Sequence, residues 1–170
     1  MAVIILTGYM GSGKTTIGKK LARRLDYSFI DADTAIEKQA GYSISRIFEK
    51  LGEATFRQLE SDFIATLVTM DKVVVATGGG MPCFGDNMQR LNAAGITVYL
   101  HRLPGELAHR LIRAKNQRPL IAGKNEEELQ AFIAEHLSQR EAYYRQAKYT
   151  VDRNQQSPEF IYTLLQQDLS

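Results

Sequence analysis

The chain has 170 residues, 44% hydrophobic and 24% charged, a composition typical of one compact globular domain rather than of a disordered or fibrous protein. Its 21 Lys and Arg residues are interspersed with 19 Asp and Glu residues for a net charge of +2, which gives no support for nucleic-acid binding. No apolar run approaches the roughly 20 residues of a membrane span, and residues 3–6 lack the flanks of a signal peptide, so we expect a cytoplasmic protein without membrane contact.

Five short apolar runs alternate with longer amphipathic segments along the chain. The runs cover residues 3–6, 28–30, 73–76, 96–100 and 149–151. Strands that are apolar on both faces and separated by helix-length connections form a parallel sheet that is covered on both sides. The sequence therefore predicts a single domain, residues 1–170, of the α/β class.

The segment after the first predicted strand reads Gly-Tyr-Met-Gly-Ser-Gly-Lys-Thr over residues 8–15, and it fits the phosphate-binding pattern G-x-x-x-x-G-K-[ST] at every fixed position. A helical pattern follows directly, so backbone N–H groups can converge on phosphate oxygens at the positive end of that helix. Lys14 is expected to reach the β- and γ-phosphates, and the Thr15 hydroxyl to bind Mg²⁺. The predicted ATP-binding residues of this segment are Gly11, Ser12, Gly13, Lys14, Thr15 and Thr16. A glycine-rich turn that matches by chance is the alternative, and nucleotide binding alone does not separate a kinase from a GTPase switch or an ATPase.

Two acidic residues, Asp31 and Asp33, follow the second predicted strand. If the chain stays extended there, both side chains point to the same side at the carboxyl edge of the sheet, where open α/β sheets bind ligands. One could hold Mg²⁺ through water while the other accepts a hydrogen bond from the hydroxyl of an acceptor. Alternatively, the pair caps a helix that starts near Thr34.

Residues 33–72 are too many for one crossover helix, so we expect two or three helices that form an insertion. Arg57 and Glu60 are three residues apart on one of them and therefore share a face. Glu60 could hold the guanidinium for bidentate capture of a carboxylate, although a solvated surface ion pair would give the same spacing.

Three glycines, Gly78, Gly79 and Gly80, follow the third predicted strand and leave its carboxyl end without side chains. This suits a close approach of backbone N–H groups to a ligand, with a plain flexible loop as the alternative. Further along the chain, Gly95 is expected to end the helix over residues 86–94 in a left-handed conformation. Ser157 and Pro158 are a cap and first-turn pair, which predicts a closing helix over residues 158–167.

Residues 115–124 are polar and punctuated by Pro119 and Gly123, which is typical of a mobile lid. Arg118 in this segment could neutralise charge that develops on the phosphates during transfer. Arg140 lies on the helix that follows and, taken alone, is interpreted as a solvent-exposed residue.

The cysteine and the three histidines give no sign of a metal site. Cys83 is the only cysteine, which fits a reducing compartment and a structural thiol. His101, His109 and His136 show no metal-ligand spacing and are interpreted as structural or surface residues.

Together these motifs resemble the pattern of the shikimate kinases along nearly the whole chain. That pattern consists of G-x-M-G-x-G-K-[ST], an Asp-x-Asp, F-R-x-x-E, a triple glycine, R-P-L and a late R-x-x-x-Y. The chain supplies them in order at residues 8–15, 31–33, 56–60, 78–80 and 118–120, and at Arg140 with Tyr144.

The resemblance implies a P-loop NTPase of three α/β/α layers with a five-stranded parallel sheet in the order 2-3-1-4-5. It also implies a single kinase domain with a helical substrate-binding insertion over about residues 33–62 and a lid over about residues 113–124. ATP and shikimate would be the substrates and Mg²⁺ the cofactor, giving 3-phosphoshikimate and ADP in the route to chorismate and the aromatic amino acids. We expect a monomer.

The resemblance also implies roles for individual residues. Asp33 would bind the shikimate hydroxyls and accept the proton of the attacking one, while Asp31 would hold Mg²⁺ through water. Arg57 and Arg140 would clamp the carboxylate beside Gly78, Gly79 and Gly80, and Arg118 would serve ATP from the lid. For adenine, Arg113 is the expected stacking residue, with Arg110 as the alternative, and Arg153 lies in the loop expected on the other face of the base.

Other functions share these features. A gluconate or nucleoside monophosphate kinase has the same fold, and a gluconate kinase would also need to grip a carboxylate. A regulatory module that binds ATP and transfers nothing is a third hypothesis, but such a module would not need the acceptor-binding residues.

Overall fold

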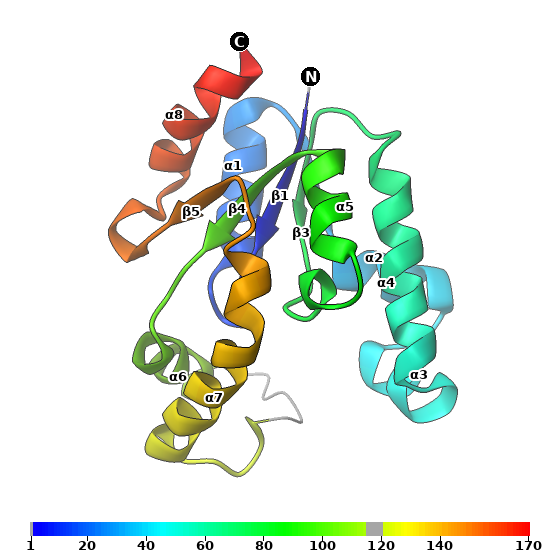
Figure 1. Cartoon of the computed structure of the whole chain (residues 1–170), viewed down its shortest axis with the longest axis vertical. Coiled ribbons are helices and arrows are strands. Elements are labelled where there is room, and N and C mark those ends of the chain that lie inside the picture. Colours follow the sequence, from blue (N-terminus) through cyan, green and yellow to red (C-terminus); the bar gives the residue numbers. More distant parts are fainter. Residues whose placement is uncertain (1, 115–120) are drawn as a thin grey trace.

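The computed structural model describes residues 2–114 and 121–170, and its centre is one parallel sheet (Figure 1). The five strands lie in the order β2-β3-β1-β4-β5, as predicted, and every neighbouring pair is parallel. The strands are β1 (Val3–Thr7), β2 (Ser28–Asp31), β3 (Val73–Ala76), β4 (Ile96–Leu100) and β5 (Tyr149–Val151). All five predicted strands are confirmed, with an extra residue at the end of β1 and of β2.

Helices connect and cover the strands. Among the described residues they are α1 (Lys14–Leu25), α2 (Ala32–Ala40), α3 (Ile44–Leu51), α4 (Glu53–Leu67), α5 (Asn87–Ala94), α6 (Pro104–Ile112), α7 (Glu126–Tyr144) and α8 (Pro158–Leu169), with short 3₁₀ helices η1 (Met81–Cys83) and η3 (Arg153–Gln155). Three helices, α2 to α4, fill the segment predicted to hold two or three. The Ser157 hydroxyl accepts a hydrogen bond of 3.1 Å from the Phe160 N–H, so the predicted cap of α8 is also confirmed.

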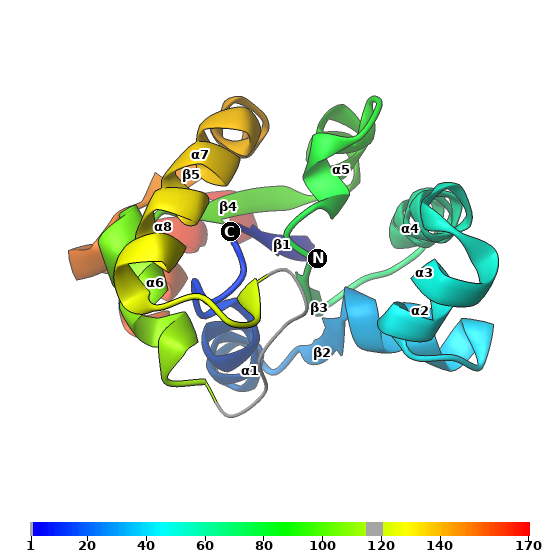
Figure 2. The same cartoon turned by 90° about the horizontal axis from the view of Figure 1, so that it is seen from below.

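Side chains that alternate along the strands bury the two faces of the sheet separately. Ile4 and Leu6 of β1 pack with α1 and α8, whereas Val3 and Ile5 pack with α4 and α5 on the opposite face. Figure 2 shows α1 on one side of the sheet and α4 and α5 on the other. The molecule therefore has the three α/β/α layers that were predicted.

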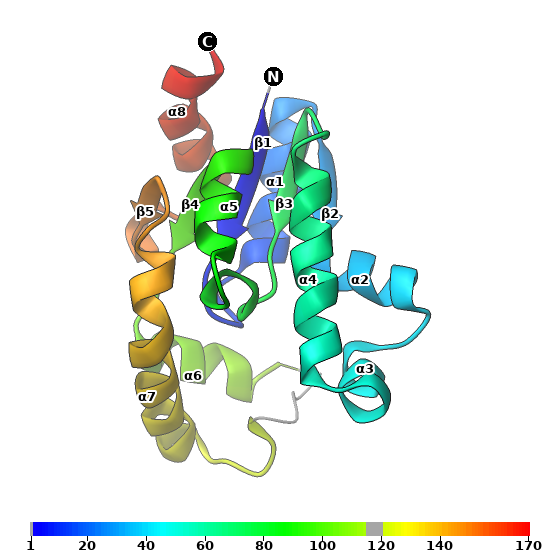
Figure 3. The ribbon, with the colours of Figure 1, turned by 45° about the vertical axis from the view of Figure 1, so that its right-hand side comes forward.

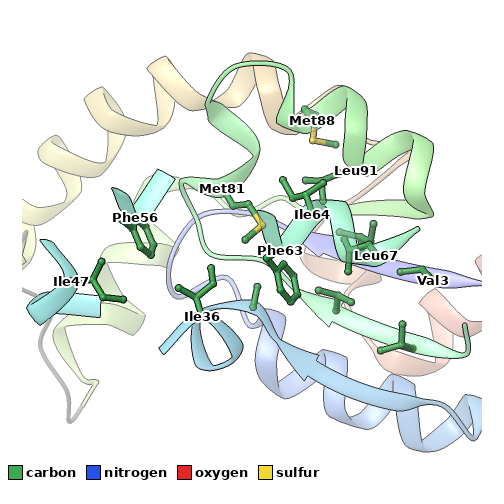
Figure 4. Packing of buried hydrophobic residues seen from close by; sticks show 14 residues of the cluster. Val3, Ile36, Ile47, Phe56, Phe63, Ile64, Leu67, Met81, Met88 and Leu91 are labelled. Atoms are coloured by element: carbon green, nitrogen blue, oxygen red, sulfur yellow. The ribbon is translucent and has the colours of Figure 1, made fainter. Parts of the chain in front are cut away.

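The face that carries α4 and α5 holds an aliphatic and aromatic core (Figure 4). Phe63, Ile64 and Leu67 of α4 meet Met88 and Leu91 of α5 there, and all five are buried. Burial of one such side chain stabilises the fold by roughly 1.5–3 kcal/mol, so α4 is fixed firmly to the sheet at this end. Its other end carries Arg57 beyond the strands.

Two groups of helices extend past the carboxyl ends of the strands. Figure 3 shows α6 and α7 on one side and α2, α3 and the start of α4 on the other. A separate apolar cluster holds α6 and α7 to the residues after β1, including Tyr9 and Met10. In the described part of the chain, no helix is long and apolar enough to cross a membrane.

The prediction for Gly95 is wrong. Gly95 follows α5 in an extended conformation, with φ of −173° and ψ of −165°, rather than a left-handed one. The position still requires glycine, because a Cβ there would lie 2.2 Å from the carbonyl oxygen of Val3. Close packing against β1, and not the way the helix ends, explains the residue.

Candidate functional site

A cavity of about 300 Å³ lies at the carboxyl edge of the sheet. It is bounded by the loop after β1 and the start of α1, by Asp31 and Asp33, by Thr77 to Gly79, and by α6. Most of the residues predicted to bind ATP therefore line one space, together with the first two glycines of the triple-glycine segment. Its lining residues are Met10, Gly11, Gly13, Lys14, Thr15, Thr16, Asp31, Asp33, Thr77, Gly78, Gly79, Arg110, Leu111 and Ala114.

The loop between β1 and α1 has the conformation that its glycines permit. Gly11 and Gly13 have φ of 80° and 100°, in the left-handed region that favours glycine. The Lys14 ammonium group is buried and donates hydrogen bonds to the carbonyl oxygens of Gly8 (2.6 Å) and Tyr9 (3.0 Å). Because α1 begins at Lys14, the N–H groups of its first turn lie at the cavity, where an anion can accept from them.

Thr15 and Asp31 form the candidate metal site. The Thr15 hydroxyl donates a hydrogen bond of 3.0 Å to the Asp31 carboxylate, and both side chains line the cavity. A hydroxyl and a carboxylate oxygen are hard donors of the kind that Mg²⁺ prefers. These residues therefore fit the ion.

Asp31 and Asp33 both line the cavity, but the backbone conformation between them differs from the prediction. The extended chain ends at Asp31, whose carboxylate caps α2 by accepting from the Thr34 N–H at 3.1 Å. Asp33 lies in the first turn of α2, so the expected alternation of an extended chain is wrong here. The capping alternative holds for Asp31, although the helix starts at Ala32 rather than near Thr34.

Asp33 packs directly against the backbone after β3. A Cβ on Gly78 would lie 2.6 Å from Asp33 Oδ1, so the carboxylate occupies the space that a side chain at position 78 would need. Gly78 is therefore required for this close approach, and the reading of the triple glycine as a plain flexible loop does not account for it.

Arg57 is held from two directions. Its Nη1 donates a hydrogen bond of 2.6 Å to Glu60, whose side chain is 1% exposed, so the pair is not a solvated surface ion pair. The guanidinium also lies 3.8 Å from the ring centroid of Phe84. Burial raises the pKa of Glu60 to about 6, an effect that Arg57 partly offsets.

Arg140 brings a second guanidinium to the same place from α7. A Cβ on Gly80 would lie 2.9 Å from Arg57 Nη1 and 3.3 Å from Arg140 Nη2, so both side chains converge on this glycine. The sequence alone suggested that Arg140 is exposed to solvent, but its side chain is half-buried. One turn later, the Tyr144 hydroxyl donates to the Gly79 carbonyl oxygen and fixes α7 to this segment.

The residues expected around adenine do not line one common cavity. Arg110 lines the cavity, with its Nη2 3.4 Å from a Cβ built on Gly13, whereas Arg113 ends α6 and is not among the lining residues. Arg153 lines a second space of about 360 Å³ with Arg102 and Asn154. Arg118, the predicted lid residue, lies outside the described residues.

Sequence reasoning missed several neighbours of the site. Arg102 donates a hydrogen bond of 3.2 Å from Nε to the Ser12 carbonyl oxygen, which joins the second space to the phosphate-binding loop. Phe84 covers Arg57, and nothing in the local sequence marks it. His136 could have been found, because it stands four residues before Arg140 and eight before Tyr144 on one helical face.

Cys83 has the environment of a structural thiol. Burial raises its pKa to about 11, so the thiol is protonated at neutral pH. No cluster of three or more His, Cys, Asp or Glu residues suited to a metal occurs within residues 2–114 and 121–170.

Comparison of the sequence with known proteins points to the family that the geometry of the site suggests. The family model described as shikimate kinase matches residues 10–170. The shikimate kinase of Bacteroides fragilis is 48% identical over 149 residues, which are 88% of this chain and 83% of that protein. That of Parabacteroides distasonis is 46% identical over 152 residues, 89% of this chain and 88% of that protein.

Solved structures agree with the sequence relatives. The shikimate kinase of Bacteroides thetaiotaomicron superposes with a TM-score of 0.88 at 42% identity, covering 99% of this chain and 98% of that one. The shikimate kinase of Acinetobacter baumannii, solved in complex with shikimate, gives a TM-score of 0.83 at 36% identity, covering 99% of this chain and 93% of that one.

Proposed function

The chain belongs to the shikimate kinase family, and from this premise we propose how its own residues carry the γ-phosphoryl group of ATP to the 3-hydroxyl of shikimate. The products are 3-phosphoshikimate and ADP, on the route to chorismate and the aromatic amino acids. The observation that carries the proposal is the convergence of Arg57 and Arg140 on Gly80, beside the cavity that the phosphate-binding loop lines.

The phosphate chain of ATP binds along the loop after β1. The N–H groups of Gly11, Ser12 and Gly13, and of Lys14, Thr15 and Thr16 at the start of α1, donate to its oxygens. The Lys14 ammonium group donates hydrogen bonds to the carbonyl oxygens of Gly8 and Tyr9, which supports a position at the loop where the phosphates bind in this proposal. Its charge then stabilises the transferring group.

Mg²⁺ is the cofactor of this proposal, held by the Thr15 hydroxyl directly and by Asp31 through water. When bound, it neutralises charge on the phosphate oxygens of ATP. The existing hydrogen bond between Thr15 and Asp31 keeps both oxygen donors on the same side of the cavity.

Shikimate binds across the cavity from the phosphates. Arg57 and Arg140 clamp its carboxylate with charge-assisted hydrogen bonds, and the backbone of Gly78 to Gly80 lies beside it. Glu60 keeps the Arg57 guanidinium in place. Gluconate also carries a carboxylate, so this clamp selects the charge and not the ring.

Asp33 accepts the hydrogen bond and then the proton of the attacking 3-hydroxyl. Its carboxylate packs against Gly78 and lines the same cavity as the phosphate-binding loop. Transfer then depends on alignment of the hydroxyl with the γ-phosphorus and on stabilisation of charge, with no covalent intermediate on the protein.

The nucleotide base lies between α6 and the loop after β5. Arg110 stacks on one face, because it lines the cavity and Arg113 does not, and Arg153 lies at the other face. Arg118 acts on the phosphates from the lid of residues 113–124, and this lid and the insertion of residues 33–62 together exclude water.

We further propose that the protein is a cytoplasmic monomer; no role assigned above requires a residue from a second chain. Size-exclusion chromatography with light scattering tests the monomer, and a dimeric mass would contradict it.

A panel of acceptors tests the function. ADP release is measured side by side with shikimate, gluconate, AMP and no acceptor, and we expect rapid release with shikimate only. Lys14→Ala and Asp33→Asn should each lose most of that turnover. Faster release with gluconate or AMP would point to a different small-molecule kinase, and ATP binding without any release would point to a regulatory module.

A further inference from the structure

A partly buried contact joins the phosphate-binding loop to α7. Tyr9 occupies one of the variable positions of the phosphate-binding pattern, and its side chain is 1% exposed. Its hydroxyl shares a hydrogen bond of 2.8 Å with Nδ1 of His136, and the two rings meet edge to face with centroids 5.5 Å apart. The pattern for phosphate binding requires no particular side chain at this position, so phosphate binding does not account for the contact.

Each partner lies next to a residue that handles a substrate. The carbonyl oxygen of Tyr9 accepts from the Lys14 ammonium group at 3.0 Å. His136 stands one helical turn before Arg140, whose guanidinium carbon is 5.9 Å from the centroid of the Tyr9 ring. One tyrosine therefore contacts the phosphate-binding lysine through its backbone and the carboxylate-binding side of the site through its ring.

The contact is well suited to fix a distance. Two planar rings have few rotatable bonds, and α7 is fixed in turn by the bond from Tyr144 to Gly79. Burial, and the charge of Arg140 to a lesser degree, lower the pKa of His136, so the imidazole is neutral at about pH 7 and can share a hydrogen bond with the tyrosine hydroxyl. A hydrogen-bonded network holds its members rigidly when every member has a partner, and Tyr9, the member on the loop, is itself buried.

We propose that Tyr9 and His136 are positioning residues that set the separation between the phosphoryl group on the loop and the acceptor held by Arg140. The inference rests on the proposed function, because it concerns the alignment of those two substrates. Neither side chain needs to touch a reacting atom. Loss of the contact lets the loop and α7 shift relative to each other, and a misplacement of about 1 Å can lower a rate on the order of a hundredfold.

Tyr9→Phe and His136→Phe test the proposal, since each removes a partner of the hydrogen bond and keeps an aromatic ring. We expect kcat to fall by about tenfold or more while the KM values for ATP and shikimate change by less than about twofold, the pattern of lost alignment rather than lost binding. We also expect a larger share of ADP to be released without 3-phosphoshikimate, because misaligned acceptor leaves room for water. The double variant should be no worse than either single variant, since both changes break one contact.

Matched controls separate positioning from stability. His136→Gln retains a polar group at this position and should recover part of kcat. His109→Gln is the control: it removes an exposed histidine of α6 that pairs with Glu126 of α7, and it should leave kcat and both KM values unchanged. Melting temperatures are measured for every variant, and Tyr9→Phe, which removes a single oxygen atom, carries the test if His136→Phe does not fold.

Several results would overturn the inference. They are an unchanged kcat and unchanged product yield per ADP in Tyr9→Phe, additive losses in the double variant, or a loss confined to KM or to melting temperature. The wild-type protein in the same assay separates this from the proposed function, because failure of the wild type to phosphorylate shikimate would refute that function itself.

Discussion

Replacement of Gly80 by alanine adds a single carbon where the two guanidinium groups of the site converge. Gly80 has φ of −87° and ψ of −17°, which alanine adopts without strain. The new Cβ would lie 2.9 Å from Arg57 Nη1, 3.2 Å from Arg57 Nη2 and 3.3 Å from Arg140 Nη2. All three are the ends of flexible side chains, so the guanidinium groups move and the backbone does not.

The size of the effect follows from these distances. Arg57 must retreat by roughly half an ångström to reach ordinary contact, enough to spoil one charge-assisted hydrogen bond to the substrate carboxylate, which is worth about 1.5–3 kcal/mol. A loss of about 2 kcal/mol lowers kcat/KM for shikimate about 30-fold. Stability should change by less than about 1 kcal/mol, because the loss of chain entropy in the unfolded state offsets the adjustment.

Steady-state kinetics with each substrate varied in turn measures this prediction. We expect the KM for ATP to stay within about twofold of the wild type, because Gly80 does not line the cavity of the phosphate-binding loop. Gly105→Ala is the matched control, since its Cβ would make an ordinary contact of 3.5 Å with Gln130, away from the substrates. An unchanged kcat/KM for shikimate in Gly80→Ala would refute the convergence of the two arginines on the acceptor.

Variants at three other positions test separate parts of the structure. Gly95→Ala should lower the free energy of unfolding by about 3 kcal/mol in denaturant titration, because its Cβ meets the backbone of Val3 at 2.2 Å, and a loss below about 1 kcal/mol would contradict that packing. Glu60→Gln tests the pKa of Glu60, which is raised in the folded protein from 4.5 to about 6. The protonated carboxyl group therefore stabilises the fold fully below about pH 4.5, and this contribution is lost as the pH rises through about 6. The unfolding free energy of the wild type relative to Glu60→Gln should fall by about 2 kcal/mol between about pH 4.5 and pH 7, whereas parallel curves would show that the pKa is not raised. Phe84→Leu should raise the KM for shikimate about threefold by removing the ring over Arg57, with recovery in Phe84→Tyr, and equal KM values in both variants would show that the ring does not matter.

The strands were predictable because their signal is local. Runs that are apolar on both faces, at helix-length spacing, marked all five strands, and the order of the sheet followed from the resemblance. Gly95 shows the limit of such reasoning. The sequence marks a glycine after a helix, but the reason for it, the carbonyl of Val3, lies on another strand.

Asp33 was misread for a related reason. An Asp-x-Asp after a strand fits both an extended chain and a capped helix, and the hydrogen bond from Thr34 to Asp31 decides for the helix. The two aspartates still reach one cavity, because the first turn of α2 bends Asp33 back over Gly78.

Within the site, local motifs were predictable and cross-chain contacts were not. The phosphate-binding loop is a continuous segment whose glycines and lysine have fixed spacing. Tyr9 and His136 are 127 positions apart, and Phe84 reaches Arg57 from a different element, so no spacing in the sequence signals either contact. The resemblance predicts that Arg140 binds the substrate carboxylate, whereas the partial burial of its side chain could be learned only from the fold.

The carboxylate clamp is tested most directly by removing the charge from both sides of the contact in turn. We would measure kcat/KM for shikimate and for its uncharged methyl ester with the wild type and with Arg140→Leu. We expect the wild type to prefer shikimate by about 100-fold and Arg140→Leu to prefer it by a clearly smaller factor, because Arg57 alone is then left to pair with the carboxylate. Equal use of the acid and the ester by the wild type, or an undiminished preference in Arg140→Leu, would contradict it.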